Sequence, residues 1–168
     1  HSKDIELGLQ RVQQVAQRLN LRANFPIITV AGTNGKGSSC AMLAQIYQHA
    51  GYKVASYTSP HLIDSRERIC INQQMISEPQ ACTAFAAVEQ PRAGTPLTYF
   101  EFGTLAAMYY FLQQQVDVAI LEIGMGGRLD AVNVFEPSCS IVTSVDLDHM
   151  EFLGDTRESI GAEKAGVF

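Results

Sequence analysis

The segment ITVAGTNGKGSSC, residues 28–40, joins an apolar run to a loop in which glycines surround one lysine. Gly32, Gly35 and Gly37 let the backbone approach an anion closely, and Lys36 supplies a positive charge. A strand, a glycine loop and a helix in this order direct backbone N–H groups and the positive helix end toward one point. The segment therefore predicts phosphate binding, although a tight turn with a solvated lysine would use the same residues.

This loop departs from the general nucleotide-binding pattern G-x-x-x-x-G-K-[ST]. Val30 stands five residues before Gly35, where the pattern has its first glycine, and Gly37 follows the lysine in place of serine or threonine. Ser38 and Ser39 come next and can donate hydroxyl groups. The pattern alone thus predicts phosphate binding without assigning the loop to the common P-loop class.

Three further polar residues each follow a predicted strand, namely Ser59 in TSPHL, Glu122 at the end of VDVAILE and His149 in DLDHM. Carboxyl ends of parallel strands meet at one sheet edge, so we expect these side chains near Lys36. Beside a triphosphate, Glu122 would hold Mg²⁺ directly or through water. The alternatives are an ion pair between Glu122 and Arg128, and a purely structural histidine.

Four more basic residues complete the inventory. Arg66 and Arg68 follow the Ser59 loop, Arg128 follows a pair of glycines, and Lys164 lies in a predicted helix. Each of them is equally typical of a solvated surface.

Alternating helices and strands must position these residues. Apolar periodicity and turn signals predict helices over 4–19, 38–50, 77–88, 98–114 and within 157–168, and strands over 27–31, 53–58, 116–122 and from 139. The strands are apolar on both faces, which is typical of a parallel sheet covered by helices on both sides. The fold class is therefore α/β, a mostly parallel sheet with a glycine phosphate loop and a small two-stranded excursion near 68–76.

Capping signals support two of these helices. Ser77 precedes Gln80 by three residues, and Thr98 precedes Glu101 by three, which is the capping-box spacing. The helix over 98–114 is apolar nearly all round, so it should be largely buried.

Composition excludes several classes of protein. The 168 residues are 46% hydrophobic and carry a formal net charge of −5, so a general nucleic-acid binder with a basic face is not expected. Apolar runs are strand-sized, so no membrane span is expected. The four cysteines have no C-x-x-C spacing, which favours buried free thiols in a reducing cytoplasm over a zinc site.

The chain resembles the ATP-binding domain of the folylpolyglutamate synthases, within the Mur ligase superfamily, and most of all the bifunctional dihydrofolate synthase/folylpolyglutamate synthases. The resemblance covers about residues 5–168 and includes the glycine after Lys36, where muramyl ligases usually have threonine. It is carried, in family order, by AGTNGKGS, TSPHL with RERI, TYFEFGTLAA, LEIGMGGRLDAVN, SVDLDHMEFLG and ESIGAEKAG.

The resemblance implies roles for individual residues. It implies ATP binding by Thr33, Asn34, Gly35 and Lys36, and Mg²⁺ binding at two sites by Ser59, Glu122 and His149, with K⁺ a candidate further ion. It implies that Lys164 is carbamylated and supports the second metal, so Lys36, His149 and Lys164 are the expected catalytic residues. It implies dihydropteroate binding by Glu6, Leu7, Gly8, Thr98, Tyr99, Phe100, Glu101, Leu129, Asp130 and Ala131. The family often has aspartate in place of Glu6, and threonine in place of Val132.

The implied reaction is ATP-dependent addition of L-glutamate to dihydropteroate and to the glutamyl tail of reduced folates. An acyl phosphate would form, and ADP and phosphate would be released. Family members have a longer ATP-binding domain and a Rossmann-type C-terminal domain, so residues 1–168 are expected to be part of that first domain and inactive alone. Family members are usually monomers. Two alternatives remain open, a small-molecule P-loop kinase and a nucleotide-binding module without catalysis.

Overall fold

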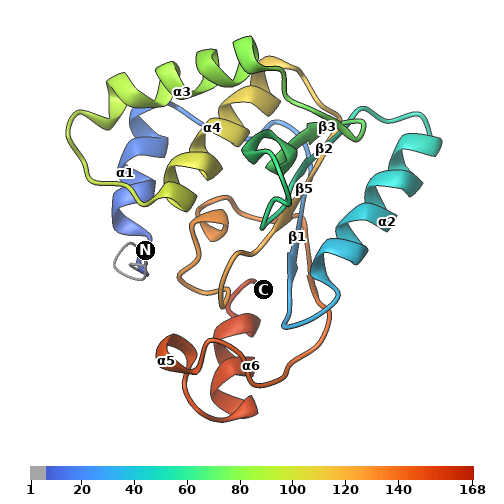
Figure 1. Cartoon of the computed structure of the whole chain (residues 1–168), viewed down its shortest axis with the longest axis vertical. Helices are drawn as coiled ribbons and strands as arrows, with labels where there is room; N and C mark the ends of the chain where they lie inside the picture. The colour runs from blue at the N-terminus through green and yellow to red at the C-terminus, as the bar shows by residue number, and fades with distance from the viewer. Residues whose placement is uncertain (1–6) are drawn as a thin grey trace.

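A six-stranded sheet with helices on both faces forms the framework of the computed structural model, which describes residues 7–168 (Figure 1). The strand order is β4-β3-β2-β5-β1-β6. Strands β2, β5, β1 and β6 run parallel, whereas β3 pairs antiparallel with β2 and β4 pairs antiparallel with β3. The bounds are β1 Ile27–Ala31, β2 Val54–Tyr57, β3 Ile69–Ile71, β4 Gln74–Met75, β5 Val118–Glu122 and β6 Cys139–Val142. The mostly parallel α/β arrangement predicted from the sequence is confirmed.

The central strands bury side chains on both faces, as their apolar runs predict. Ile27 and Ala31 of β1 join the larger core, whereas Ile28 and Val30 join a smaller one, because successive strand residues point to opposite faces. Helix α2 covers the smaller core, and α1, α3 and α4 cover the larger one (Figure 1). The helix bounds are α1 Gln10–Arg18, α2 Lys36–His49, α3 Glu78–Arg92 and α4 Tyr99–Gln113.

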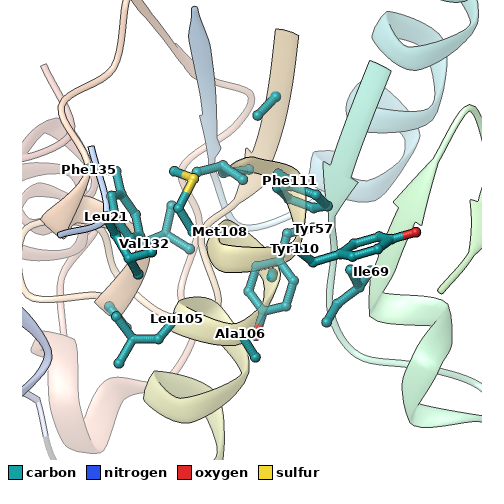
Figure 2. Packing of buried hydrophobic residues seen from close by; sticks show 14 of the residues in the cluster. Leu21, Tyr57, Ile69, Leu105, Ala106, Met108, Tyr110, Phe111, Val132 and Phe135 are labelled. Atoms are coloured by element: carbon teal, nitrogen blue, oxygen red, sulfur yellow. The ribbon is translucent and has the colours of Figure 1, made fainter. Parts of the chain in front are cut away.

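Helix α4 lies at the centre of the larger core (Figure 2). Its Leu105, Met108 and Phe111 are almost completely buried, and Tyr57 of β2 and Val132 belong to the same cluster. Each large apolar side chain buried in this way contributes about 1.5–3 kcal/mol of transfer free energy. This packing fixes α4 against the sheet and thereby positions the segment at its N-terminal end. Val132 belongs to the short 3-10 helix η2, Ala131–Val134.

Several predicted helix boundaries are wrong. Helix α1 begins at Gln10, residues 7–9 are not helical, and Gly8 has φ +154°, which ends any helix there. The part of that prediction before residue 7 lies outside the described residues, as does Glu6. Helix α2 begins at Lys36, two residues earlier than predicted, and α3 continues to Arg92 because it packs along α4.

The edges of the sheet also differ from expectation. Strands β3 and β4 confirm the two-stranded excursion, but β3 pairs with β2, so the excursion extends the main sheet. The 3-10 helix η1, Ser65–Arg68, precedes it. Strand β6 is partly exposed, because it lies at the other edge. Helices α5, Met150–Leu153, and α6, Arg157–Ala165, follow β6.

The prediction of buried cysteines holds only for Cys40. Cys70 is partly buried, and Cys82 and Cys139 are exposed, although all of them are free thiols. Across residues 7–168 no helix has the length and apolar character that a membrane crossing requires.

Candidate functional site

The glycine loop between β1 and α2 has the geometry of an anion-binding turn. Gly35 adopts φ +82° as the N-cap of α2, whose first N–H groups have no partner within the helix. Gly32 has φ +144°, and a Cβ there would lie 1.9 Å from Oγ1 of Thr143, so only glycine fits. The ammonium group of Lys36 folds back over the loop and donates to the carbonyl oxygens of Gly32 (2.9 Å) and Thr33 (3.3 Å). The positive groups therefore gather at one end of α2.

Hydrogen bonds join this loop to the segment that follows β6. Oγ1 of Thr33 donates to the carbonyl oxygen of Asp146 (3.1 Å) and accepts from its N–H (3.0 Å). The N–H groups of Thr33 and Asn34 donate to the carbonyl oxygen and Oγ of Ser144, respectively. Thr33 and Asn34, the first two residues of the predicted phosphate-binding set, thus hold the two loops together, and no motif in the sequence predicts this pairing.

Glu122 lies at the carboxyl end of β5 and is 4% exposed. Its Oε2 accepts a hydrogen bond from the N–H of Ser59 (2.9 Å), which confirms that these two predicted residues meet. Burial raises the pKa of Glu122, whereas the hydrogen bond from Ser59 and the charge of Lys36 act in the opposite direction. Lys36, Ser59 and Glu122 therefore lie at one edge of the sheet.

The alternative partner proposed for Glu122 is engaged elsewhere. Arg128 forms an ion pair with Glu163 of α6, with 2.7 Å between Nη2 and Oε1. The N–H of Arg128 also donates to the carbonyl oxygen of Glu163 (2.9 Å). These contacts hold α6 against the loop after β5.

Lys164 of α6 is only 2% exposed, so its interpretation as a surface lysine is wrong. Burial lowers its pKa, as does the positive charge of Lys36, while the charge of Asp148 raises it. His149 follows Asp148, has a left-handed backbone (φ +46°) and is the N-cap residue of α5. Its Nε2 lies 3.6 Å from Oδ1 of Asp148.

A cavity of about 850 Å³ brings the predicted residues together. Lys36, Ser59 and His149 line it, whereas Glu122 and Lys164 lie buried at this edge, and Gly8 is not part of the wall. The wall also includes most of the residues expected to bind dihydropteroate, namely Leu7, Thr98, Tyr99, Phe100, Glu101, Leu129, Asp130 and Ala131. Four further lining residues have no role predicted from the sequence, namely Pro60, Arg68, Gly124 and Met125.

One wall of the cavity is held by the start of α4. Thr98 caps the helix, because its Oγ1 accepts from the N–H of Glu101 (3.2 Å) and its N–H donates to Oε2 of Glu101 (2.7 Å). Oε1 of Glu101 accepts from Nη2 of Arg11 (2.9 Å). The ring of Phe100 lies against Gly124, where a Cβ would lie 2.7 Å from Cζ. The predicted capping box is confirmed, and it shapes the site.

Asp130 organises the part of the wall that follows β5. Its Oδ2 accepts from the N–H groups of Gly124 (3.1 Å) and Met125 (2.9 Å), and its Oδ1 accepts from the N–H of Val132 (3.0 Å). Burial raises the pKa of Asp130 from 3.8 to about 6, although these three hydrogen bonds lower it. The carboxylate therefore fixes the loop that joins β5 to η2.

This arrangement predicts a pH dependence of stability. Because the folded pKa of Asp130 exceeds the unfolded one, this carboxyl group binds more protons in the folded state, and its contribution to stability falls as pH rises from about 4 to 6. In Asp130→Asn this contribution is absent, so the stability difference in favour of wild type should shrink by up to ~3 kcal/mol between pH 4 and pH 7. Urea unfolding of both proteins at these two pH values measures it, and a constant or growing difference would contradict it.

Comparisons with known proteins agree with this geometry. Residues 30–168 match the family model described as the Mur ligase middle domain. The chain is 52% identical over 169 residues to the dihydrofolate synthase/folylpolyglutamate synthase of Escherichia coli K12. The alignment covers 100% of this chain and 40% of that protein. It is 41% identical to the enzyme of the same name from Bacillus subtilis, and spans 40% of its length.

Solved structures give the same result. The E. coli FolC structure with DHPP and ADP superposes on this chain with a TM-score of 0.96 at 52% identity. The superposition covers 100% of this chain and 41% of the FolC chain. A bifunctional folylpolyglutamate synthase/dihydrofolate synthase with Mn, AMPPNP and L-glutamate bound superposes with a TM-score of 0.92. That superposition covers 98% of this chain and 41% of the other chain. The resemblance drawn from the motifs is thereby confirmed. The chain belongs to the Mur ligase family, whose middle domain accounts for residues 30–168.

Proposed function

We propose that this chain provides the nucleotide and folate sites of an ATP-dependent ligase. The ligase would add L-glutamate to dihydropteroate and to the glutamyl tail of reduced folates, as a cytoplasmic monomer acting on small molecules. The observation that carries the proposal is the cavity of about 850 Å³, in which Lys36, Ser59 and His149 face the segments at Thr98–Glu101 and Leu129–Ala131. The chain spans 40% of the E. coli relative, so the activity is proposed for the polypeptide that carries it.

The residues suit a reaction in which a carboxylate is activated by phosphorylation. A substrate carboxylate oxygen attacks the γ-phosphorus, the bond to ADP breaks, and an acyl phosphate forms. The amine of L-glutamate then attacks the acyl carbon, phosphate leaves with the bonding electrons, and the amine loses a proton. Lys36 and the N-terminal end of α2 would hold the phosphates in line, which is most of what phosphoryl transfer requires.

The metal sites proposed for Ser59, Glu122 and His149 are chemically suitable. The Ser59 hydroxyl and the buried Glu122 carboxylate are oxygen ligands, which Mg²⁺ prefers. The backbone N–H of Ser59 donates to the Glu122 carboxylate, so the two residues are adjacent. When bound, Mg²⁺ would neutralise phosphate charge. Within residues 7–168 no three His, Cys, Asp or Glu side chains form a metal-binding group, so phosphate oxygens are expected to complete both Mg²⁺ sites. K⁺ remains a candidate further ion.

Lys164 is suited to carbamylation. Its lowered pKa increases the neutral amine fraction, and the neutral amine is the form that attacks CO₂. A nitrogen–carbon bond forms, a C=O bonding pair moves to oxygen, and the nitrogen loses a proton to solvent. The product is anionic, so repulsion between Lys164 and Lys36 would become attraction. The carbamate could then support the second metal beside His149.

The direct test is an assay of the natural polypeptide that carries this sequence, with ATP, Mg²⁺, L-glutamate and either dihydropteroate or tetrahydrofolate. The expected products are ADP, phosphate and the corresponding glutamyl amide, detected by mass spectrometry. A phosphorylated product formed without glutamate would identify a kinase instead. ATP binding with no turnover of either substrate would identify a non-catalytic module.

A further inference from the structure

One cation in the cavity wall has no part in the proposed phosphate chemistry. Lys36 and Arg68 are the lysine and arginine that line the cavity within residues 7–168, and Lys36 belongs to the phosphate loop. The two acids of the wall already have partners, since Glu101 binds Arg11 and Asp130 accepts backbone N–H groups. Arg68 therefore carries positive charge into the cavity that neither acid neutralises.

The guanidinium group of Arg68 is held in a defined orientation. Its Nε donates to Nδ1 of His61 (2.8 Å), and its Cζ lies 5.1 Å from the ring centroid of Tyr99. Its terminal nitrogens, Nη1 and Nη2, make no hydrogen bond to any residue between 7 and 168. Arg66, two residues earlier, differs, because its Nε and Nη2 donate to the carboxylate of Asp64. Arg68 thus presents a planar pair of donors on a half-buried surface.

Paired N–H donors of this kind match the two oxygens of a carboxylate, and a stacked guanidinium loses little rotamer freedom on binding. A carboxylate that is to be phosphorylated must lie beside the phosphate loop, so it cannot at the same time bind the guanidinium group of Arg68. Dihydropteroate has one carboxylate, which is the reacting one. A reduced folate with a glutamyl tail has a second carboxylate, the α-carboxylate, which does not react.

We propose that Arg68 binds the non-reacting α-carboxylate of a glutamylated folate and so distinguishes that substrate from dihydropteroate. The inference rests on the proposed function and assigns substrate specificity within the same cavity. Tyr99 and His61 act as positioning residues, because they hold the guanidinium group rather than contact the carboxylate.

The test compares two ligands and four proteins. Equilibrium dissociation constants for tetrahydrofolate and for dihydropteroate are measured with wild type, Arg68→Gln, Arg68→Lys and the control Arg66→Gln. We expect Arg68→Gln to weaken tetrahydrofolate binding by about tenfold or more, the usual effect of losing a charge-assisted pair of hydrogen bonds, and to change dihydropteroate binding less than about twofold. The affinity of Arg68→Lys for tetrahydrofolate should fall between those of wild type and Arg68→Gln. Arg66→Gln should match wild type for both ligands.

A change in the ligand keeps the test valid if Arg68→Gln does not fold. The α-amide of tetrahydrofolate should bind wild type about tenfold or more weakly than tetrahydrofolate does, because it lacks the charged carboxylate that Arg68 would bind. Equal losses for both ligands in Arg68→Gln, no loss for either, or unimpaired binding of the α-amide would each overturn the assignment while leaving the proposed function intact. Wild type that binds neither ligand would instead overturn the proposed function, and the assignment with it.

Discussion

Replacing Lys36 with alanine is expected to weaken ATP binding by about a hundredfold or more, because charge-assisted hydrogen bonds to phosphate are lost. The folded state should be affected little. Among residues 7–168, the ammonium group of Lys36 donates only to the carbonyl oxygens of Gly32 and Thr33 on its own loop. It also sits at the start of α2, where the helix dipole disfavours a positive charge, so we expect a stability change within about 1 kcal/mol.

Titration calorimetry with ATP and a thermal unfolding curve measure the two effects separately. Lys53→Ala is the matched control, since it removes the same charge from a lysine whose ammonium binds the carbonyl oxygen of Gln114, away from the cavity. A melting temperature lowered as much as by the core deletion Leu105→Ala would show that Lys36 is structural. Wild-type ATP affinity in Lys36→Ala would show that the loop binds something else.

Replacing Glu122 with glutamine is expected to remove most of the advantage that Mg²⁺ gives to ATP binding. The substitution keeps the shape of the side chain and an oxygen that can accept from the N–H of Ser59, but it removes the anionic metal ligand. We expect about a tenfold or greater loss of ATP affinity with Mg²⁺, of the size typical for a disrupted metal site, and a smaller loss in EDTA.

The measurement is again calorimetry, with and without Mg²⁺. Glu89→Gln is the control, because Glu89 is an exposed acid on α3 that pairs with Arg92 and does not line the cavity. Since burial raises the pKa of Glu122, neutralising it should not destabilise the fold. Equal losses in the presence and absence of metal would exclude a ligand role.

Local patterns in the sequence were sufficient for the framework of the site. The apolar runs of β1 and β5 required burial on both faces, and the observed cores contain alternate residues of each strand. Thr98 caps α4 as its spacing to Glu101 predicts. Because parallel strands end at one edge, Ser59 and Glu122 could be expected to meet, and a hydrogen bond joins them.

Features that depend on distant contacts could not be predicted from local patterns. Lys164 appeared to be a surface lysine, and only the docking of α6 through Glu163 and Arg128 shows that it is buried. Thr33 is expected in the phosphate loop, but no local pattern indicates that its hydroxyl group binds the backbone of Asp146, more than a hundred residues away in sequence. The role proposed for Lys164 comes from the family resemblance, because the position of this residue in the sequence does not indicate it.

Arg68 shows the same limit from the opposite direction. Its sequence neighbour Arg66 has the same side chain, and nothing local separates the two residues. The structure separates them, because Arg66 is neutralised by Asp64 whereas Arg68 turns toward His61 and the cavity.

We propose that Lys36, Ser59, Glu122 and His149 surround the phosphates of one nucleotide. A crystal structure of the protein with Mn²⁺ and a non-hydrolysable ATP analogue tests it directly, because anomalous scattering locates Mn²⁺ without reference to the protein density. We predict an anomalous peak within coordination distance of Ser59 Oγ or of the Glu122 carboxylate, with the phosphates over the N-terminal end of α2. Metal and phosphates bound together at any other face of the molecule would show that these four residues do not form the nucleotide site.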